Sequence, residues 1–155
     1  MHQERPTNAE VYAKYSDDLV RFATSLVGPT DAQDVVADAV VKVMWSKRWS
    51  KVTNYKAYLY RAVLNEARMH HRSTMRRRAR EQRASDSDVI YPSDVRPEIL
   101  EAVGRLSPKQ RAAVFLTYWE GLGVDEVATR LGVREGSVKR HLARARSRLR
   151  GNLDE

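Results

Sequence analysis

The fold is decided by residues 123–150, which read GVDEVATRLGVREGSVKRHLARARSRLR. A helix-turn-helix motif needs a small residue in its first helix, a turn residue that tolerates positive φ, and an apolar anchor in its second helix. Counted from Val124, Ala128 stands at the fifth place, Gly132 at the ninth and Val138 at the fifteenth. These three positions, in register, predict two helices that meet at a tight turn centred on Gly132.

The second helix of this motif, from about Arg134, carries the charge expected of a helix that enters the DNA major groove. Residues 134–150 hold seven Lys or Arg and one Glu, a net charge of +6. Arg and Lys can pair with guanine, for roughly 1–3 kcal/mol of discrimination per bidentate contact, and others hold phosphates. The candidates for DNA contact are Arg134, Ser137, Lys139, Arg140, Arg144 and Arg146. The alternative is a charged terminal helix packed on its neighbours.

Composition bounds the class of protein. The 155 residues are 42% hydrophobic and 31% charged, with only 7 Gly and 5 Pro, which favours helices. A net charge of +8 makes a polyanion the first partner to consider. The chain has no cysteine, which excludes disulfides and thiolate chemistry. Without a signal peptide or a long apolar run, it is expected to be cytoplasmic, with no membrane insertion.

Apolar periodicity predicts three helices in the N-terminal part. The first spans residues 8–27, and Gly28 with Pro29 ends it. Thr30 or Asp31 can cap the second helix, which is expected to run to about Trp49. The third begins near Asn54 and can continue into the arginine run at 76–80, within a second basic segment of net charge +6 at residues 61–84.

Composition shifts after this segment, where residues 84–94, ASDSDVIYPSD, are rich in Ser and Asp. Beyond it, Ser107, Pro108 and Gln110 form a capping box that begins another helix. We therefore predict an all-α chain of two small helical domains, residues 1–83 and 96–155, joined by a flexible linker at 84–95. The C-terminal domain is the helix-turn-helix.

Three segments carry a resemblance to a known family. Residues 106–150, LSPKQRAAVFLTYWEGLGVDEVATRLGVREGSVKRHLARARSRLR, resemble the promoter-reading fourth region of bacterial RNA polymerase sigma factors. Residues 32–45, AQDVVADAVVKVMW, resemble their second-region helix, and residues 57–73, AYLYRAVLNEARMHHRS, resemble the segment that meets the downstream promoter element. Two such units with a short linker resemble the extracytoplasmic-function (ECF) group of the sigma-70 family, over nearly the whole chain.

The resemblance implies roles for these residues in transcription initiation. The second helix would bind the β′ clamp helices of core RNA polymerase through Asp34, Asp38, Val41 and Met44. Residues 49–72 would open and read the downstream element as single-stranded DNA, with a base flipped into a pocket beside the 50–56 loop. The candidates there are Trp49, Tyr55, Tyr58, Asn65, Arg68 and Arg72. The C-terminal domain would read the upstream element and meet the β flap, and an anti-sigma factor is a further implied partner.

Plainer interpretations stand beside these roles. The aromatic residues can be ordinary core, and Asp34, Asp38 and Lys42 can form an exposed i,i+4 network worth a few tenths of a kcal/mol. The family usually has Gln where this chain has Ala37 and Trp where it has Tyr58. Free in solution, the chain is expected to bind duplex DNA weakly, because a flexible linker leaves the two domains unoriented.

Two other classes of protein remain as alternatives. One is a helix-turn-helix transcription regulator that acts as a dimer without binding core polymerase. The other is an enzyme that acts on nucleic acid, which would need a catalytic cluster that the sequence does not offer. His70 and His71 are adjacent and diverge by about 100° on a helix, so they do not suggest a metal site. We expect no enzymatic activity, no metal and no cofactor.

Overall fold

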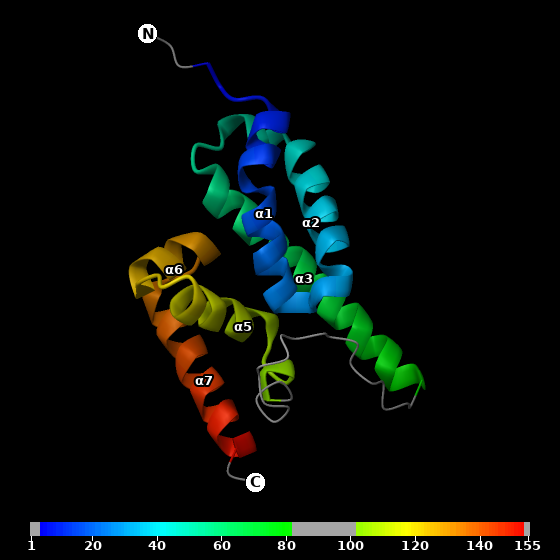
Figure 1. Ribbon diagram of the computed structural model, residues 1–155, viewed down its shortest axis with the longest axis vertical. Helices are drawn as coiled ribbons and strands as arrows, with labels where there is room; N and C mark the ends of the chain where they lie inside the picture. Colours follow the sequence, from blue (N-terminus) through cyan, green and yellow to red (C-terminus); the bar gives the residue numbers. More distant parts are fainter. Residues whose placement is uncertain (1–3, 82–101, 154–155) are drawn as a thin grey trace.

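The computed structural model describes residues 4–81 and 102–153, and every regular element in these ranges is helical (Figure 1). The N-terminal unit, residues 4–81, holds α1 (Asn8–Val27), α2 (Pro29–Met44), the 3-10 turn η1 (Lys47–Lys51) and α3 (Tyr55–Glu81). The C-terminal unit, residues 102–153, holds α5 (Pro108–Val114), the π-helical turn η2 (Phe115–Trp119), α6 (Val124–Leu131) and α7 (Glu135–Leu153). The predicted all-α class is confirmed, and the predicted linker lies outside the described residues.

Helix α1 begins and ends as its sequence predicts. The Thr7 hydroxyl accepts from the backbone N–H of Glu10, and the Glu10 carboxylate accepts from the N–H of Thr7, which completes a capping box. Leu19 and Phe22 are fully buried on its inner face. Gly28, at φ 87°, ends α1 in a backbone conformation that other residues rarely adopt.

The predicted second helix is too long, since α2 ends at Met44 and not near Trp49. Ser46 then caps η1, its hydroxyl accepting from the N–H of Arg48. This short turn directs Trp49 back into the core. If α2 continued to this residue, the Trp49 side chain would point outward. The beginning also differs, because Gly28 precedes α2 directly and Pro29 occupies its first turn.

Helix α3 is the longest element and packs against both α1 and α2. Its 27 residues span about 40 Å. The Asn54 side chain caps its start by accepting from the N–H of Ala57. Tyr60, Val63 and Ala67 are fully buried, but no side chain in 68–80 is. The last turns of α3 therefore project past the ends of α1 and α2, as Figure 1 shows.

The predicted helix-turn-helix is confirmed in its three diagnostic positions. Ala128 is buried in α6, Val138 is fully buried in α7, and Gly132 takes the left-handed conformation at φ 69°. Val127 and Leu131 complete the buried face of α6. The turn therefore holds the start of α7 at a fixed angle to α6.

The two units contact each other through an apolar seam. The Phe22 ring lies 4.6 Å from the Tyr60 ring and 6.0 Å from the Phe115 ring, centroid to centroid. Phe115 belongs to the C-terminal unit, so Phe22 joins the two cores. Burial raises the pKa of Tyr60 to about 12. Arg111 closes one end of the seam, because its Nη1 donates to the Leu26 carbonyl at 2.7 Å.

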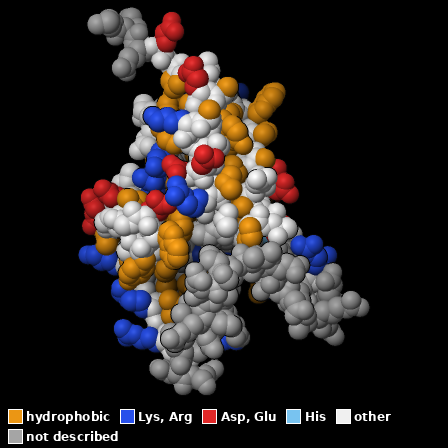
Figure 2. Space-filling view, viewed as in Figure 1, with side chains coloured by type: hydrophobic (Ala, Val, Ile, Leu, Met, Phe, Trp, Pro, Cys, Tyr) orange, Lys and Arg blue, Asp and Glu red, His pale blue; other side chains and the backbone are white. Residues whose placement is uncertain are grey.

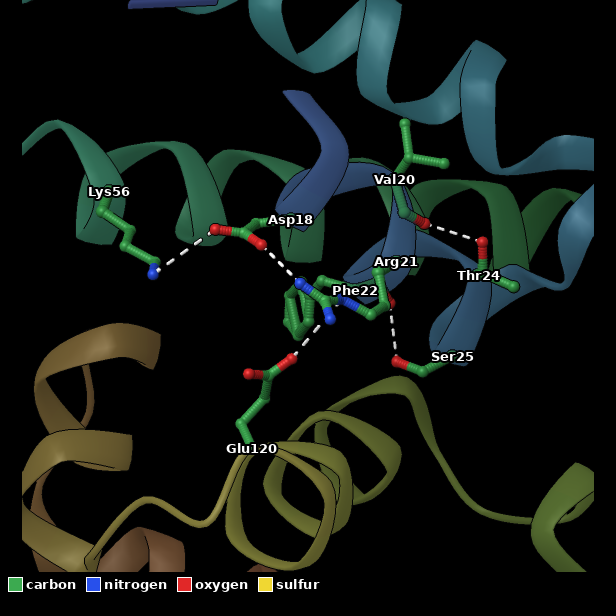
Figure 3. A network of polar contacts seen from close by, with 8 residues as sticks. All are labelled: Asp18, Val20, Arg21, Phe22, Thr24, Ser25, Lys56 and Glu120. Atoms are coloured by element: carbon green, nitrogen blue, oxygen red, sulfur yellow. Dashed lines mark hydrogen bonds and ion pairs between the residues drawn. The ribbon is translucent and has the colours of Figure 1, made fainter. Parts of the chain in front are cut away.

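Polar contacts border this seam. Figure 3 shows Arg21 of α1 between Asp18, at 2.5 Å, and Glu120 of the C-terminal unit, at 3.7 Å. At the other border, Arg61 of α3 donates to the Thr129 carbonyl at 3.0 Å, and the Arg130 guanidinium lies 4.8 Å from the centre of the Tyr60 ring. These contacts place the two units against each other in this structure, and weak DNA binding by the free chain stays a prediction.

We expect Gly132→Ala to lower the free energy of unfolding by about 1–2 kcal/mol, because an L-residue is strained at this φ. A Cβ there would also collide with the Arg61 side chain. Urea denaturation measures the loss. Gly136→Ala is the matched control, since a Cβ at this helical position meets nothing within 4 Å. An equal loss in both variants would contradict the role given to the turn.

Candidate nucleic-acid interface

Helix α7 presents a basic face on the side opposite to its buried residues. Leu142 and Ala145 continue the buried line from Val138, whereas Lys139 and Arg140 are exposed. Figure 2 shows Lys and Arg side chains in a row along the outer edge of α7. The structure thus brings most of the predicted upstream set onto one surface.

The members of this set differ in their surroundings. Ser137 is half-buried, and its hydroxyl accepts from Arg140 Nη2 at 3.3 Å. Arg134 and Arg144 are exposed, at the start and in the middle of the helix. Arg146 is exposed on the flank, where its Nη1 lies 3.4 Å from the Tyr118 hydroxyl.

His141 contributes less positive charge to this face than a solvent-exposed histidine would. Burial, and after it the nearby Lys109 ammonium, hold the pKa of His141 below its usual value. The charge that α7 offers to DNA therefore comes mainly from its Arg and Lys residues.

Helix α3 carries three members of the predicted downstream set on one face. Tyr58, Asn65 and Arg72 are seven residues apart, so their directions differ by about 40° in all. Asn65 and Arg72 are exposed, and Tyr58 and Arg68 are half-buried. This face is open to a ligand along much of its length.

The prediction that Trp49 is an exposed base-stacking residue is wrong. Trp49 is only 5% exposed, and its indole N–H donates to Asn8 Oδ1 at 2.8 Å. The rings of Tyr55 and Tyr58 pack on it at 5.2 and 6.2 Å. Arg5 donates to the Trp49 carbonyl and covers the ring. Trp49 is a core residue, and the half-buried rings of Tyr55 and Tyr58 pack on it at the start of α3.

An acidic and apolar stripe runs along the outer face of α2. Asp34, Asp38 and Val41 are exposed and lie within about 60° of one another. Met44 is half-buried, so it offers less exposed surface to a partner than the sequence suggested. The stripe ends instead at Trp45, which is 86% exposed. Figure 2 shows hydrophobic side chains over this end of α2. We call Asp34, Asp38, Val41 and Trp45 the α2 stripe.

Trp45 is absent from the residues predicted for this surface. Its position four residues after Val41 indicates that the two side chains lie on the same side of the helix. Beside the stripe is a cavity of about 290 Å³, lined among others by Asp31, Glu66 and His70.

The alternative interpretation, an exposed network of Asp34, Asp38 and Lys42 within α2, is wrong about the partner of Lys42. Lys42 pairs with Glu66 of α3 at 2.5 Å, which raises the pKa of Lys42.

No group of His, Cys, Asp and Glu residues in the described ranges could hold a metal ion. Within the same ranges, no helix is long and apolar enough to cross a membrane. What the described surfaces do offer is two basic faces, on α7 and α3, and the α2 stripe.

Comparison with known proteins gives the family. Residues 11–77 match sigma-70 region 2 and residues 96–149 match sigma-70 region 4. The RNA polymerase sigma-E factor of Streptomyces avermitilis is 32% identical over 145 residues, which are 89% of this chain and 80% of that protein. The ECF RNA polymerase sigma factor SigE of Mycolicibacterium smegmatis is 29% identical over 163 residues, covering 96% and 62%.

A solved structure agrees. It shows the sigma factor RpoE in complex with the anti-sigma factor NepR from Bartonella quintana, with a TM-score of 0.63 and 27% identity over 92% of this chain and 94% of that one. The fold and the two matched regions define a promoter-recognition factor. The chain belongs to the sigma-70 family, in its ECF group, and functions in transcription initiation.

We expect Trp49→Ala to lower the free energy of unfolding by about 3–5 kcal/mol, because it empties a core position and frees the Asn8 side chain. Asn65→Ala, on the exposed face of α3, should change it by no more than about 0.5 kcal/mol. Urea denaturation followed by circular dichroism compares the two. A stable Trp49→Ala variant would contradict the burial of this side chain.

Proposed function

We propose that this chain gives core RNA polymerase its choice of promoter through three surfaces. The α2 stripe binds the β′ clamp helices, the exposed face of α3 meets the downstream element, and α7 reads the upstream element. The C-terminal unit also meets the β flap. The observation that carries the proposal is the α2 stripe, because a regulator that binds only DNA has no need of it.

The chemistry of the α2 stripe suits a helical protein partner with basic and apolar groups. Its two carboxylates lie one turn apart and can pair with Lys or Arg on the partner. Val41 and Trp45 lie one turn apart farther along, and Trp is among the side chains that most often dominate the affinity of an interface. The α2 stripe thus offers a partner first two carboxylates for ion pairs and then two apolar side chains for burial, along one helix.

The α3 face suits single-stranded DNA. Asn65 can hydrogen-bond a base edge, and Arg72 can hold a phosphate. Both are exposed and lie two turns apart on the same side of the helix. Trp49 supports this face from behind and does not stack on a base itself. The half-buried rings of Tyr55 and Tyr58 then form one wall for a base that leaves the duplex.

The α7 face suits duplex DNA. Lys139 and Arg140 lie in the first turns of the helix that follows the helix-turn-helix turn, which is the part that reaches base edges in this motif. Arg144 and Arg146 lie farther along and hold phosphates, which position the helix without reading sequence.

The proposed function also implies how the chain is regulated and where in the cell it works. Because RpoE was solved with an anti-sigma factor, we infer that an anti-sigma factor also controls this chain, by covering the α2 stripe. The chain then works in the cytoplasm beside polymerase. It performs no catalytic step and needs no cofactor, because promoter choice requires only binding.

We expect Trp45→Ala to weaken binding to core polymerase by about 30-fold or more, since truncating a dominant interface residue costs at least 2 kcal/mol. The stability of the free chain should not change, because the side chain is almost fully exposed. Fluorescence anisotropy of the labelled chain, titrated with core polymerase, measures the affinity.

Tyr12→Ala is the matched control, an exposed aromatic side chain on α1, outside the α2 stripe. It should leave the affinity for polymerase unchanged. Wild-type chain that shows no affinity for core polymerase, but binds a palindromic duplex as a dimer, would favour the dimeric regulator.

A further inference from the structure

A short segment ahead of α1 holds the turn that joins α2 to α3. The Arg5 guanidinium donates from Nη1 to the Ser50 carbonyl and from Nη2 to the Trp49 carbonyl. It lies 5.8 Å from the centre of the Trp49 ring and 5.5 Å from the centre of the Tyr55 ring. Figure 1 shows the start of α1 and this turn at the same end of the N-terminal unit.

A second contact fastens the same turn. The Asn8 side chain accepts from the Trp49 indole N–H at 2.8 Å. We call residues 5–8 the N-terminal strap. Helix α1 does not need Arg5 for its own start, because Thr7 and Glu10 complete the capping box. The contacts of Arg5 therefore serve the turn and not the helix that follows.

The strap reaches a part of the turn that has little other support. In residues 50–54 every side chain is exposed except the half-buried Val52. A loop with few buried groups is held by a small number of contacts, so each contact has a large effect on its position. Arg5 binds the first carbonyl of this 50–54 loop and the carbonyl before it. The strap can thus set where the loop lies.

The 50–54 loop leads directly into the aromatic wall proposed for a base that leaves the duplex. Asn54 caps α3 and Tyr55 is the first residue of that helix, so a base beside Tyr55 and Tyr58 lies next to the loop. A site that selects one base must be held to within about 0.5 Å, because hydrogen bonds weaken steeply when their geometry changes. A displaced loop would therefore lose discrimination at that base and at no other.

We propose that the N-terminal strap, through Arg5, holds the 50–54 loop in the position at which it selects one base of the downstream promoter element. This inference rests on the proposed function of the α3 face. Arg5 is a positioning residue that acts through the loop and does not touch the base. A DNA phosphate is a less suitable partner for Arg5, because both of its terminal nitrogens already donate to protein carbonyls.

The test compares three variants of the full chain. Arg5→Ala removes both the charge and the planar fork that donates to two carbonyls, whereas Arg5→Lys removes only the fork. Lys14→Ala is the matched control, because Lys14 is also an exposed cation over a ring, 5.4 Å from that of Tyr15 on its own helix. Each chain is assembled with core polymerase. The holoenzyme then selects from duplexes in which each position of a wild-type promoter is varied, and sequencing gives the relative affinity for every base.

We expect Arg5→Ala to reduce discrimination at one position of the downstream element by about tenfold, since a wrong base in a site typically costs about 5- to 150-fold in affinity. Arg5→Lys should reduce it at the same position. Both variants should keep the wild-type preference at the other positions and the wild-type dependence of affinity on salt. Lys14→Ala should match the wild type throughout.

Hydrogen exchange of the free chain separates a displaced loop from a damaged fold. Arg5→Ala should speed exchange of the amides in the 50–54 loop and leave the buried amides of Leu19 and Phe22 unchanged. If Arg5→Ala also speeds exchange at Leu19 and Phe22, Arg5→Lys decides the matter, because it keeps the charge over the rings.

Other outcomes overturn the inference. Unchanged base preference in both Arg5 variants would mean that the loop keeps its position without the strap. A uniform loss on all duplexes, with a weaker salt dependence and recovery in Arg5→Lys, would assign Arg5 to a phosphate. An equal loss in Lys14→Ala would reduce the effect to net charge. A wild-type holoenzyme that selects no promoter over random DNA would instead contradict the proposed function, which keeps the two failures apart.

Discussion

The burial of α3 against α1 and α2 is the interaction on which the other surfaces depend. Tyr60 of α3 is fully buried, and its ring is contacted by Phe22 of α1 and by the Arg130 guanidinium of the C-terminal unit. Because one side of α3 is held in this way, its opposite side stays exposed and its register is fixed. The α2 stripe faces outward for the same reason, since Val36 and Ala39 are buried within the N-terminal unit.

The contact between the units is partly apolar and partly polar. Arg21 is more than half exposed where it meets Glu120, and such surface pairs contribute about 0–1 kcal/mol each. The apolar part rests on Phe22 and Phe115. Each unit also has its own buried residues, such as Val63 in one and Val138 in the other. Buried residues of both units nevertheless belong to one continuous core.

Periodicity and spacing predicted much of this from sequence. The three positions of the helix-turn-helix follow from backbone requirements that only certain residues meet, and α1 and α3 follow from apolar spacing. The exposure of individual side chains was harder to predict from the sequence. Trp49 and Trp45 are four residues apart, yet one is core and the other is almost fully exposed. The difference arises because α2 stops at Met44 and η1 turns the chain, which no local pattern indicated. The arginines that join the units were missed because their carbonyl partners lie far away in sequence.

The most direct test of the account is a run-off transcription assay with core polymerase, the full chain and a library of genomic fragments. Transcript starts are mapped by sequencing, with and without the chain. The account predicts discrete starts that appear only when the chain is present and that share two spaced upstream elements. Absence of such starts, with polymerase shown to be active with another sigma factor, would contradict it.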